Sequence, residues 1–225
     1  MNQTPDKLPA AVLFDLDGTL VDSLPDMTWA MNQLLAELGR KSTSLADMRT
    51  WVGDGAGVLV ERCLAATGGV PGAPADAVGR FLAFYRTHAA VETRPFPGVL
   101  TTLAALSAAG HPMGVCTNKP NDLSRLLLDA LDMSRFFSAV VGGDGVPERK
   151  PHPGHLLATL KSMGVENRKV LMVGDSPNDV AAARAAGVPV VVVGFGYTQV
   201  PAETLGADLV ISDFADLPRA AAEFL

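Results

Sequence analysis

A short apolar run that stops at two aspartates constrains this chain more than any other feature. The run covers residues 11–14 (Ala-Val-Leu-Phe), and Asp15 and Asp17 follow it directly, before Gly18 and Thr19. An apolar run bounded by turn residues predicts a strand that is buried on both faces, as in a parallel α/β sheet. Ligand sites in such sheets lie beyond the carboxyl ends of the strands. We therefore expect both carboxylates to lie at a ligand site.

The close spacing of Asp15 and Asp17 favours phosphoryl chemistry with a divalent cation. Two neighbouring carboxylates repel each other, which disfavours ionisation of both unless a cation lies between them. Mg²⁺ takes oxygen ligands and often binds one or two carboxylates together with a substrate phosphate. One aspartate can then attack phosphorus while the other exchanges protons with the leaving group and with water. Gly18 would turn the backbone tightly and leave amides open to a phosphate. The alternative is an ordinary Asp-rich turn at the end of a strand.

The composition limits the possible partners and the compartment. With 225 residues, the chain can form one large domain or two modest ones, and its formal net charge of −6 argues against a nucleic acid or an anionic membrane as partner. Cys63 and Cys116 lie far apart in apolar contexts, so we expect reduced, buried thiols in a cytoplasmic protein. Residues 1–10 are polar, so neither a signal peptide nor a membrane span is expected. We expect a monomer or a small homo-oligomer.

Helical patterns alone occupy the stretch between residues 24 and 91. Apolar residues recur at helical spacing from about residue 24 to Gly39, and further helices are expected over residues 44–51, 56–66 and 75–90, with a loop at 68–74. No strand candidate occurs inside this stretch. We interpret it as a separate small helical domain.

From residue 95 onward the pattern alternates between strands and helices. After an expected linker at 95–97 and a helix over 99–109, strands are expected at 113–116, 139–141, 170–173, 188–193 and 209–211. This alternation predicts a Rossmann-like α/β fold with a doubly wound parallel sheet. The first strand has no other partner and must join the same sheet. We therefore predict an α/β core of residues 1–22 and 93–225, with residues 23–92 inserted after the first strand as a helical cap above the carboxylates.

Polar residues follow the next two strands at the same predicted edge of the sheet. Thr117, Asn118 and Lys119 supply a hydroxyl, an amide and backbone N–H groups that could hold phosphate oxygens, although Asn118 also suits an ordinary Asx turn. Lys150 lies between turn residues, where it could contact phosphate and offset the acids, although most lysines are simply solvated.

Two more acids follow the fourth strand of the predicted sheet. Asp175 could complete the oxygen shell of a metal, with Asp179 supporting it from behind. The alternative is helix capping by Asp175 or Ser176, with Asp179 favoured near the positive end of a helix predicted over 180–186. His152 and His155 are interpreted as surface or helix-start residues without a catalytic role.

Taken together, these segments resemble the motifs of the haloacid dehalogenase superfamily. The stretch from Asp15 to Thr19 resembles its first motif, Thr117-Asn118 its second, Lys150 its third, and Gly174-Asp175 to Asp179 its fourth. The resemblance covers the whole chain, including the inserted helical cap. It implies a Mg²⁺-dependent phosphatase acting on a small phosphorylated metabolite.

The resemblance also implies a role for each motif residue. Asp15 would be the nucleophile that forms an aspartyl-phosphate, and Asp17 the general acid and base, with Lys150 completing the catalytic set. Asp15, the backbone carbonyl of Asp17, and Asp175 would hold Mg²⁺, with Asp179 behind the metal. The expected substrate-binding residues are Gly18, Thr19, Gly55, Ala56, Thr117, Asn118 and Lys119.

Within the superfamily, the chain is most similar to bacterial phosphoglycolate phosphatases, which implies 2-phosphoglycolate as substrate. Residues 51–56, 116–120 and 143–151 carry this similarity. One departure concerns Asp54, where that subfamily usually has Asn. If the helix N-terminus at Gly55 and Ala56 binds the substrate carboxylate, Asp54 must point away or repel it; Asp54 could equally cap that helix. Arg62, further along, is expected to face solvent.

Three other functions share features with these residues. A sugar-phosphate mutase of the same superfamily would return the phosphoryl group to sugar, and a phosphatase for another small metabolite would use the same machinery. A signalling receiver module also places acids, a Thr and a Lys at strand ends. The long helical insertion and the close spacing of Asp15 and Asp17 argue against the receiver.

Overall fold

The computed structural model describes residues 9–69 and 76–225 of the chain. The N-terminal segment 1–8 and most of the loop expected at 68–74 lie outside the described residues. Within the described part, none of the helices combines the length and the apolar character that crossing a bilayer requires.

A parallel sheet forms the centre of the α/β core. In the described residues it has six strands in the order β5-β4-β1-β6-β7-β8. Every neighbouring pair is parallel. The strands are β1 (Ala11–Phe14), β4 (Met113–Thr117), β5 (Ala139–Gly142), β6 (Val170–Gly174), β7 (Val190–Val193) and β8 (Leu209–Ile211). The prediction of a doubly wound α/β fold is confirmed, and β1 lies inside the sheet between β4 and β6.

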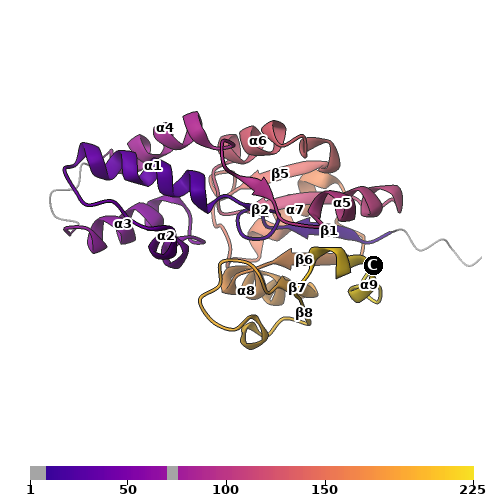
Figure 1. The fold of residues 1–225 in the computed structure, drawn as a ribbon. Coiled ribbons are helices and arrows are strands. Elements are labelled where there is room, and N and C mark those ends of the chain that lie inside the picture. The colour runs from indigo at the N-terminus through magenta and orange to yellow at the C-terminus, as the bar shows by residue number, and fades with distance from the viewer. Residues whose placement is uncertain (1–8, 70–75) are drawn as a thin grey trace, which may run out of the picture.

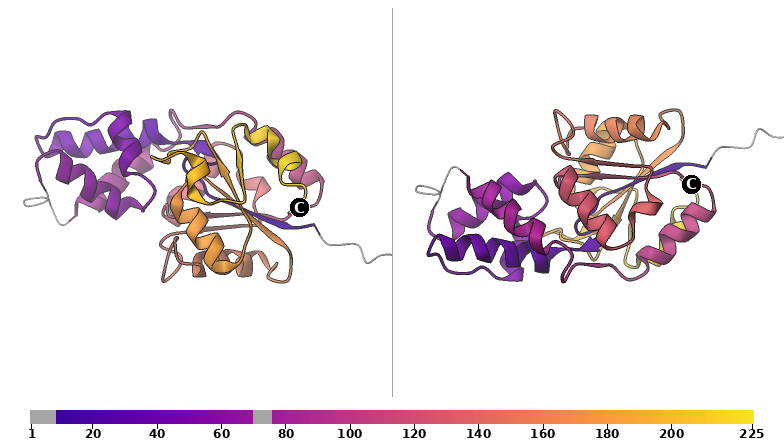
Figure 2. Two further views of the ribbon diagram at one scale, coloured as in Figure 1. Left: turned by 90° about the horizontal axis from the view of Figure 1, so that it is seen from below. Right: turned by 90° about the horizontal axis from the view of Figure 1, so that it is seen from above.

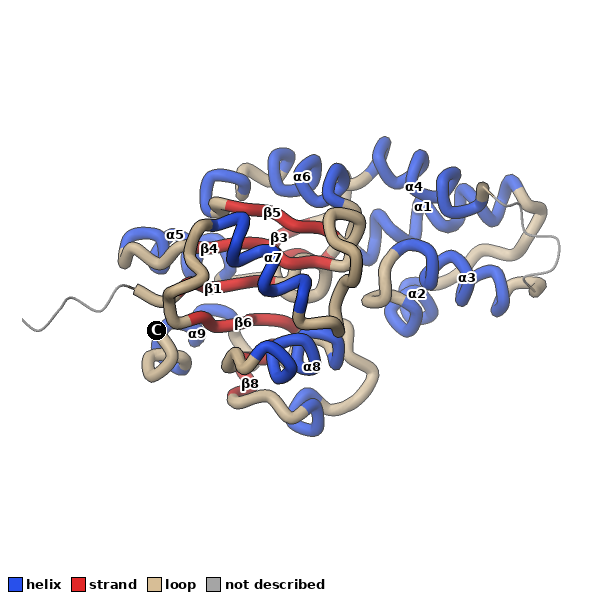
Figure 3. The backbone as a smooth tube through the Cα atoms, turned by 180° about the vertical axis from the view of Figure 1, so that it is seen from behind, coloured by secondary structure: helices blue, strands red, loops and turns tan. Residues whose placement is uncertain are grey.

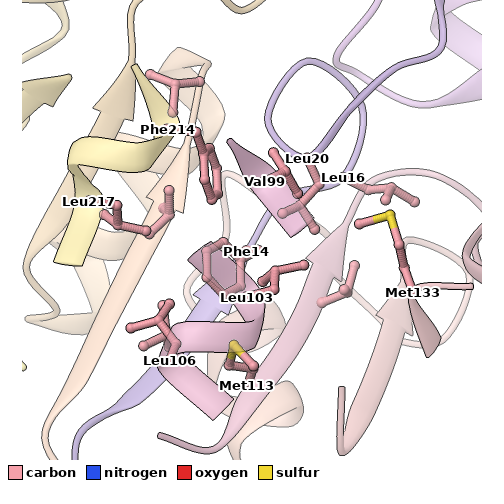
Figure 4. Packing of buried hydrophobic residues seen from close by; sticks show 14 of the residues in the cluster. Phe14, Leu16, Leu20, Val99, Leu103, Leu106, Met113, Met133, Phe214 and Leu217 are labelled. Carbon is pink, nitrogen blue, oxygen red and sulfur yellow. The ribbon is translucent and has the colours of Figure 1, made fainter. Parts of the chain in front are cut away.

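The apolar runs form strands here because helices cover both faces of the sheet. One face packs against α5 (Val99–Ala108), α6 (Asn121–Ala130) and α9 (Leu217–Ala220), with Phe14 stacked on Phe214 at 6.1 Å between ring centroids. Figure 4 shows this cluster around Phe14. The opposite face packs against α7 (Gly154–Met163) and α8 (Pro177–Ala186), which lie across the sheet in Figure 3.

Four helices gather beyond one end of the sheet, as Figure 1 shows. They are α1 (Leu24–Glu37), α2 (Leu45–Trp51), α3 (Ala56–Ala66) and α4 (Ala77–His88), and we call them the helical unit. They enclose their own apolar cluster, which includes Met31, Leu34 and Phe81. In both views of Figure 2 the helical unit stays to one side of the sheet. As predicted, the described residues between 24 and 91 contain no strand.

A small antiparallel ribbon joins the two parts of the molecule. The strand β2 (Val21–Asp22) pairs with β3 (Arg94–Pro95). The expectation of a plain linker at 95–97 was therefore wrong at its first residue. Two-residue strands are too short to produce a period in the sequence.

Candidate active site

Two carboxylates meet where the central strands end. Asp15 follows β1 and Asp175 follows β6, and Asp179 joins them from the first turn of α8, with one oxygen of each within 4.8 Å of the others. The backbone turn after Asp15 needs Gly18, whose φ is +88° and where a Cβ atom would collide with the Asp175 carboxylate. The parallel register of β1 with β6 therefore brings acids from distant parts of the sequence together, as predicted.

Lys150 lies between these acids. Its Nζ atom is 3.0 Å from Asp15 Oδ1 and 2.6 Å from Asp179 Oδ1, and its side chain is buried. Burial opposes the charge of Lys150, but the carboxylates of Asp15 and Asp179 outweigh it and raise the pKa of Lys150. Burial raises the pKa of Asp15 to about 6, with Asp179 adding to the rise and Lys150 counteracting it.

Asp179 supports the site rather than opening into it. Its Oδ2 atom accepts hydrogen bonds from the backbone N–H groups of Asp175 and Ser176 and from Ser176 Oγ. Ser176 and Asp179 thus form a capping box. The helix α8 starts at Pro177, whereas the sequence predicted a start at residue 180. The capping alternative holds for Ser176 and not for Asp175.

Asp15 and Asp175 fit a hard divalent cation. Asp15 Oδ1 is buried and accepts no hydrogen bond from the described residues, although the Lys150 ammonium lies close to it. Burial, Asp179 and Asp15 together raise the pKa of Asp175 well above its ordinary value. A buried carboxylate pair that resists joint ionisation is stabilised by a cation with oxygen ligands, and Mg²⁺ has this preference.

Asp17 is held by two side chains from distant parts of the chain. Its Oδ1 atom accepts a hydrogen bond from Ser23 Oγ at 2.6 Å, and Lys119 Nζ lies 3.0 and 3.1 Å from its two oxygens. Lys119 Nζ also donates to the hydroxyl of Tyr85, on α4 of the helical unit, at 2.7 Å. The sequence reasoning missed Ser23 and Tyr85, because a lone hydroxyl in a helical pattern carries no signal for such a contact.

The first motif does not present the substrate-binding groups that we expected. The Thr19 hydroxyl donates to Asp175 Oδ1 at 3.1 Å, and the Thr19 side chain is fully buried. The N–H groups of Gly18 and Thr19 bond to the backbone oxygens of Val21 and Leu16 within the turn. The expected substrate contacts of Gly18 and Thr19 are therefore corrected: both support Asp175 or the turn itself.

The second motif lines a cavity between the core and the helical unit. Thr117, Asn118 and Lys119 face this cavity together with Asp15 and Asp17. The Asn118 amide donates to the backbone oxygens of Gly53 and Lys150, both at 3.0 Å. Both amide hydrogens are therefore used within the protein, and the substrate contact expected from this side-chain NH₂ is not available. The remaining wall is apolar and is formed by Met27, Val52, Leu59, Phe81, Leu82, Tyr85, Pro120 and Leu123.

The helical unit adds the N-terminus of α3 to the same cavity. Gly55 is the N-cap of α3, and Gly55 and Ala56 line the cavity, where the first N–H groups of a helix favour an anion. Gly55 has a φ of +85°, and an added Cβ there would meet the Arg149 guanidinium and the backbone oxygen of Asn118 at 3.1–3.3 Å. Close packing of this loop on the core thus depends on glycine.

Asp54 does not line this cavity but a neighbouring one, whose wall also includes Asp15, Asp17 and Asp175. Its Oδ1 atom accepts a hydrogen bond from Asn178 Nδ2 at 2.7 Å, and its Oδ2 atom pairs with Arg62 at 2.5 Å. The capping alternative for Asp54 was therefore wrong, since Gly55 is the N-cap and no side chain caps α3. Arg62 was expected to face solvent, but it pairs with Asp54 while remaining 41% exposed.

His155 was expected at the surface or at a helix start; it lies in the first turn of α7 and is fully buried. Its Nδ1 atom accepts a hydrogen bond from the backbone N–H of Lys150 at 3.2 Å, and Nε2 faces the backbone oxygen of Val141 at 3.1 Å. Burial and the Lys150 charge lower its pKa to about 4, so the ring is neutral and Nε2 donates. His155 therefore fixes the loop that carries Lys150, whereas His152 is exposed as expected.

Known proteins are similar to this chain in both sequence and fold. The sequence model of the haloacid dehalogenase-like hydrolase family matches residues 12–193. The phosphoglycolate phosphatase of Caulobacter vibrioides is 48% identical over 217 residues, which cover 94% of this chain and 90% of that protein. The phosphoglycolate phosphatase of Rhodospirillum rubrum is also 48% identical, over 93% of this chain and 90% of its own length.

Solved structures show the same fold. A protein described as a predicted phosphoglycolate phosphatase from Haemophilus somnus has a TM-score of 0.85 at 33% identity, over 95% of this chain and 98% of that chain. CbbY from Rhodobacter sphaeroides, solved in complex with phosphate, has a TM-score of 0.78 at 26% identity, over 93% of this chain and 96% of its own.

Proposed function

Because the chain belongs to the haloacid dehalogenase-like hydrolase family and is a phosphoric monoester hydrolase, we propose that it hydrolyses 2-phosphoglycolate through an aspartyl-phosphate on Asp15. The observation that carries this proposal is the group of Asp15, Lys150 and Asp175 at the centre of the sheet edge, from which Asp15 faces a small cavity. The two relatives at 48% identity support the choice of substrate.

Asp15 is the proposed nucleophile. It lines the cavity at the end of the central strand β1. Lys150, at 3.0 Å, offsets the negative charge that gathers as Asp15 approaches a phosphoryl group. Attack forms a bond between an Asp15 oxygen and phosphorus and breaks the bond between phosphorus and the ester oxygen.

Asp17 is the proposed general acid and base. It lines the same cavity two residues beyond Asp15, so both carboxylates would face a phosphoryl group bound there. In the first step Asp17 gives a proton to the departing oxygen of glycolate. In the second step it takes a proton from the water that attacks the phosphorus of phospho-Asp15, and inorganic phosphate leaves.

Asp15, Asp175 and the backbone carbonyl of Asp17 are the proposed metal ligands, and Mg²⁺ bound there would neutralise charge on the phosphoryl oxygens. Thr19 would orient Asp175 through its 3.1 Å hydrogen bond, and the backbone N–H of Tyr197 would do so from the other side. Asp179 would keep Lys150 and the start of α8 in place.

The helical unit is the proposed cap, with residues 23–92 as a domain distinct from the core of 1–22 and 93–225. Its contribution is the N-terminus of α3, where Gly55 and Ala56 would hold the substrate carboxylate with backbone N–H groups. Arg62 and Asn178 pair with Asp54, and the Arg62 charge would offset its repulsion of that carboxylate. The apolar wall would exclude water and larger polar leaving groups.

The direct test is release of inorganic phosphate from a panel of small phosphomonoesters, with Mg²⁺ and with excess chelator. We expect a strong preference for 2-phosphoglycolate that the chelator abolishes and that added Mg²⁺ restores. Chelator-sensitive release from a different ester would keep the mechanism and replace the substrate. Isomerised sugar phosphate without free phosphate would instead establish a mutase and contradict the proposal.

A further inference from the structure

The Lys119 side chain is enclosed between the core and the helical unit. It is 3% exposed. Its Nζ atom contacts both oxygens of Asp17, at 3.0 and 3.1 Å, and the hydroxyl of Tyr85, at 2.7 Å. An ammonium group has three hydrogens to donate, so these contacts use all of them. Lys119 would have to give up one of these partners to bind a substrate, and the expected substrate-binding role does not explain this arrangement.

Tyr85 links the helical unit to Lys119 and, through it, to Asp17. It lies on α4, is 2% exposed, and stacks on Phe81 at 5.9 Å between ring centroids. It belongs to the apolar cluster that holds α1 to α4 together. Its hydroxyl nevertheless bonds to a lysine that follows β4 of the core. The helical unit therefore supplies, through the Tyr85 hydroxyl, the third hydrogen-bond partner of the Lys119 ammonium that holds Asp17.

We propose that Lys119 and Tyr85 are positioning residues that fix the Asp17 carboxylate for proton transfer while α4 lies against the core. This inference rests on the proposed function, because it assigns both proton transfers to Asp17. A proton donor works only within hydrogen-bond reach and in the right direction, and a carboxylate gripped at both oxygens has one orientation. Neither Lys119 nor Tyr85 touches the reacting atoms in this role.

The two half-reactions depend on Asp17 in different ways. When Asp15 attacks an alkyl ester, the bond from phosphorus to the ester oxygen breaks and the departing alkoxide needs the Asp17 proton. When Asp15 attacks acetyl phosphate, acetate leaves as a stable anion and needs no proton. The second half-reaction is the same for both substrates: water gives its proton to Asp17 as the bond from Asp15 to phosphorus breaks.

The test compares kcat/KM for 2-phosphoglycolate and for acetyl phosphate, since kcat/KM reports the first half-reaction. In Lys119→Met we expect kcat/KM to fall about 100-fold with 2-phosphoglycolate and less than about threefold with acetyl phosphate. Tyr85→Phe keeps the ring and should cost about tenfold with 2-phosphoglycolate only. With acetyl phosphate as donor, phospho-Asp15 should accumulate in Lys119→Met, because its hydrolysis is slowed.

A double substitution separates positioning from packing. Because Tyr85 acts through Lys119, Tyr85→Phe should add nothing in the Lys119→Met background. Lys161→Met, at an exposed lysine on α7, and Phe84→Leu, beside Tyr85 on α4, are the matched controls and should retain wild-type ratios. If Lys119→Met does not fold, Tyr85→Phe alone decides the matter through its substrate ratio.

Equal losses on both substrates, or additive losses in the double variant, would overturn this inference and leave the proposed function intact. Failure of the wild-type protein to release phosphate from any ester would be a different result. It would overturn the proposed function itself.

Discussion

At the scale of single residues, protonation of the Asp15 carboxyl is linked to metal binding. Burial raises its pKa from the ordinary 3.8 to about 6, with Asp179 adding to the rise and Lys150 counteracting it. A raised acid pKa means that the protonated form stabilises the fold at low pH, and that this contribution is lost as the pH rises through about 6. A bound cation favours the ionised form of Asp15 instead, because the carboxylate is the form that binds metal.

Metal binding is expected to depend on pH through Asp15. Because a proton competes for Asp15, the affinity for Mg²⁺ should be about tenfold weaker at pH 5 than at pH 7.5. The shift of the Tm on adding Mg²⁺ should therefore be larger at pH 7.5, which thermal unfolding at both pH values measures. Asp175→Asn should reduce the shift at both. A shift that is equal at the two pH values would contradict the assignment of Asp15 as a ligand.

Most of the site residues could be located from the sequence, but the partners of their side chains could not. Asp15, Lys150 and Asp175 were identifiable because strand ends in a parallel sheet share one edge. The bonds of Thr19 to Asp175 and of Lys119 to Asp17 join residues 156 and 102 positions apart. No local pattern encodes such contacts, so hydroxyls and amides that could have met a phosphate were expected to do so.

At the scale of elements, Asp26 joins the two connections between the core and the helical unit, and we call this contact the Asp26 clamp. Asp26, in the first turn of α1, is fully buried. Its carboxylate accepts hydrogen bonds from the backbone N–H groups of Glu92 and Thr93 and, at 2.6 Å, from Thr93 Oγ1. It thus ties the start of the helical unit to the segment that returns to β3. The sequence shows only an acid at a helix start, which is common.

Removing this clamp should weaken the whole fold. In Asp26→Ala, buried N–H groups lose a charged acceptor, so we expect the free energy of unfolding to fall by about 3 kcal/mol. Urea unfolding measures the change. Glu92→Ala is the matched control, because its exposed side chain is removed while its backbone N–H keeps Asp26 as acceptor. A loss in Asp26→Ala no larger than that of the control would contradict the clamp.

At the scale of the whole molecule, alternation of strands and helices was enough to predict the sheet, and the absence of alternation before residue 92 was enough to predict the helical unit. The order of the strands explains the rest: β1 lies between β4 and β6, so the residues after these three strands meet. How the helical unit lies against that edge is set by side chains such as Tyr85 and Asn118, and these gave no periodic signal.

In the proposed mechanism, Asp15 carries the phosphoryl group from substrate to water. The most direct measurement is to quench the protein with acid during turnover of 2-phosphoglycolate with Mg²⁺, reduce any acyl phosphate with borohydride, and map the modified residue by peptide mass spectrometry. We expect modification at Asp15. With acetyl phosphate as donor, whose acetate leaves without a proton, we expect more of it in Asp17→Asn, because hydrolysis of phospho-Asp15 lacks its base. Modification at another residue, or turnover with no trapped adduct in either protein, would contradict it.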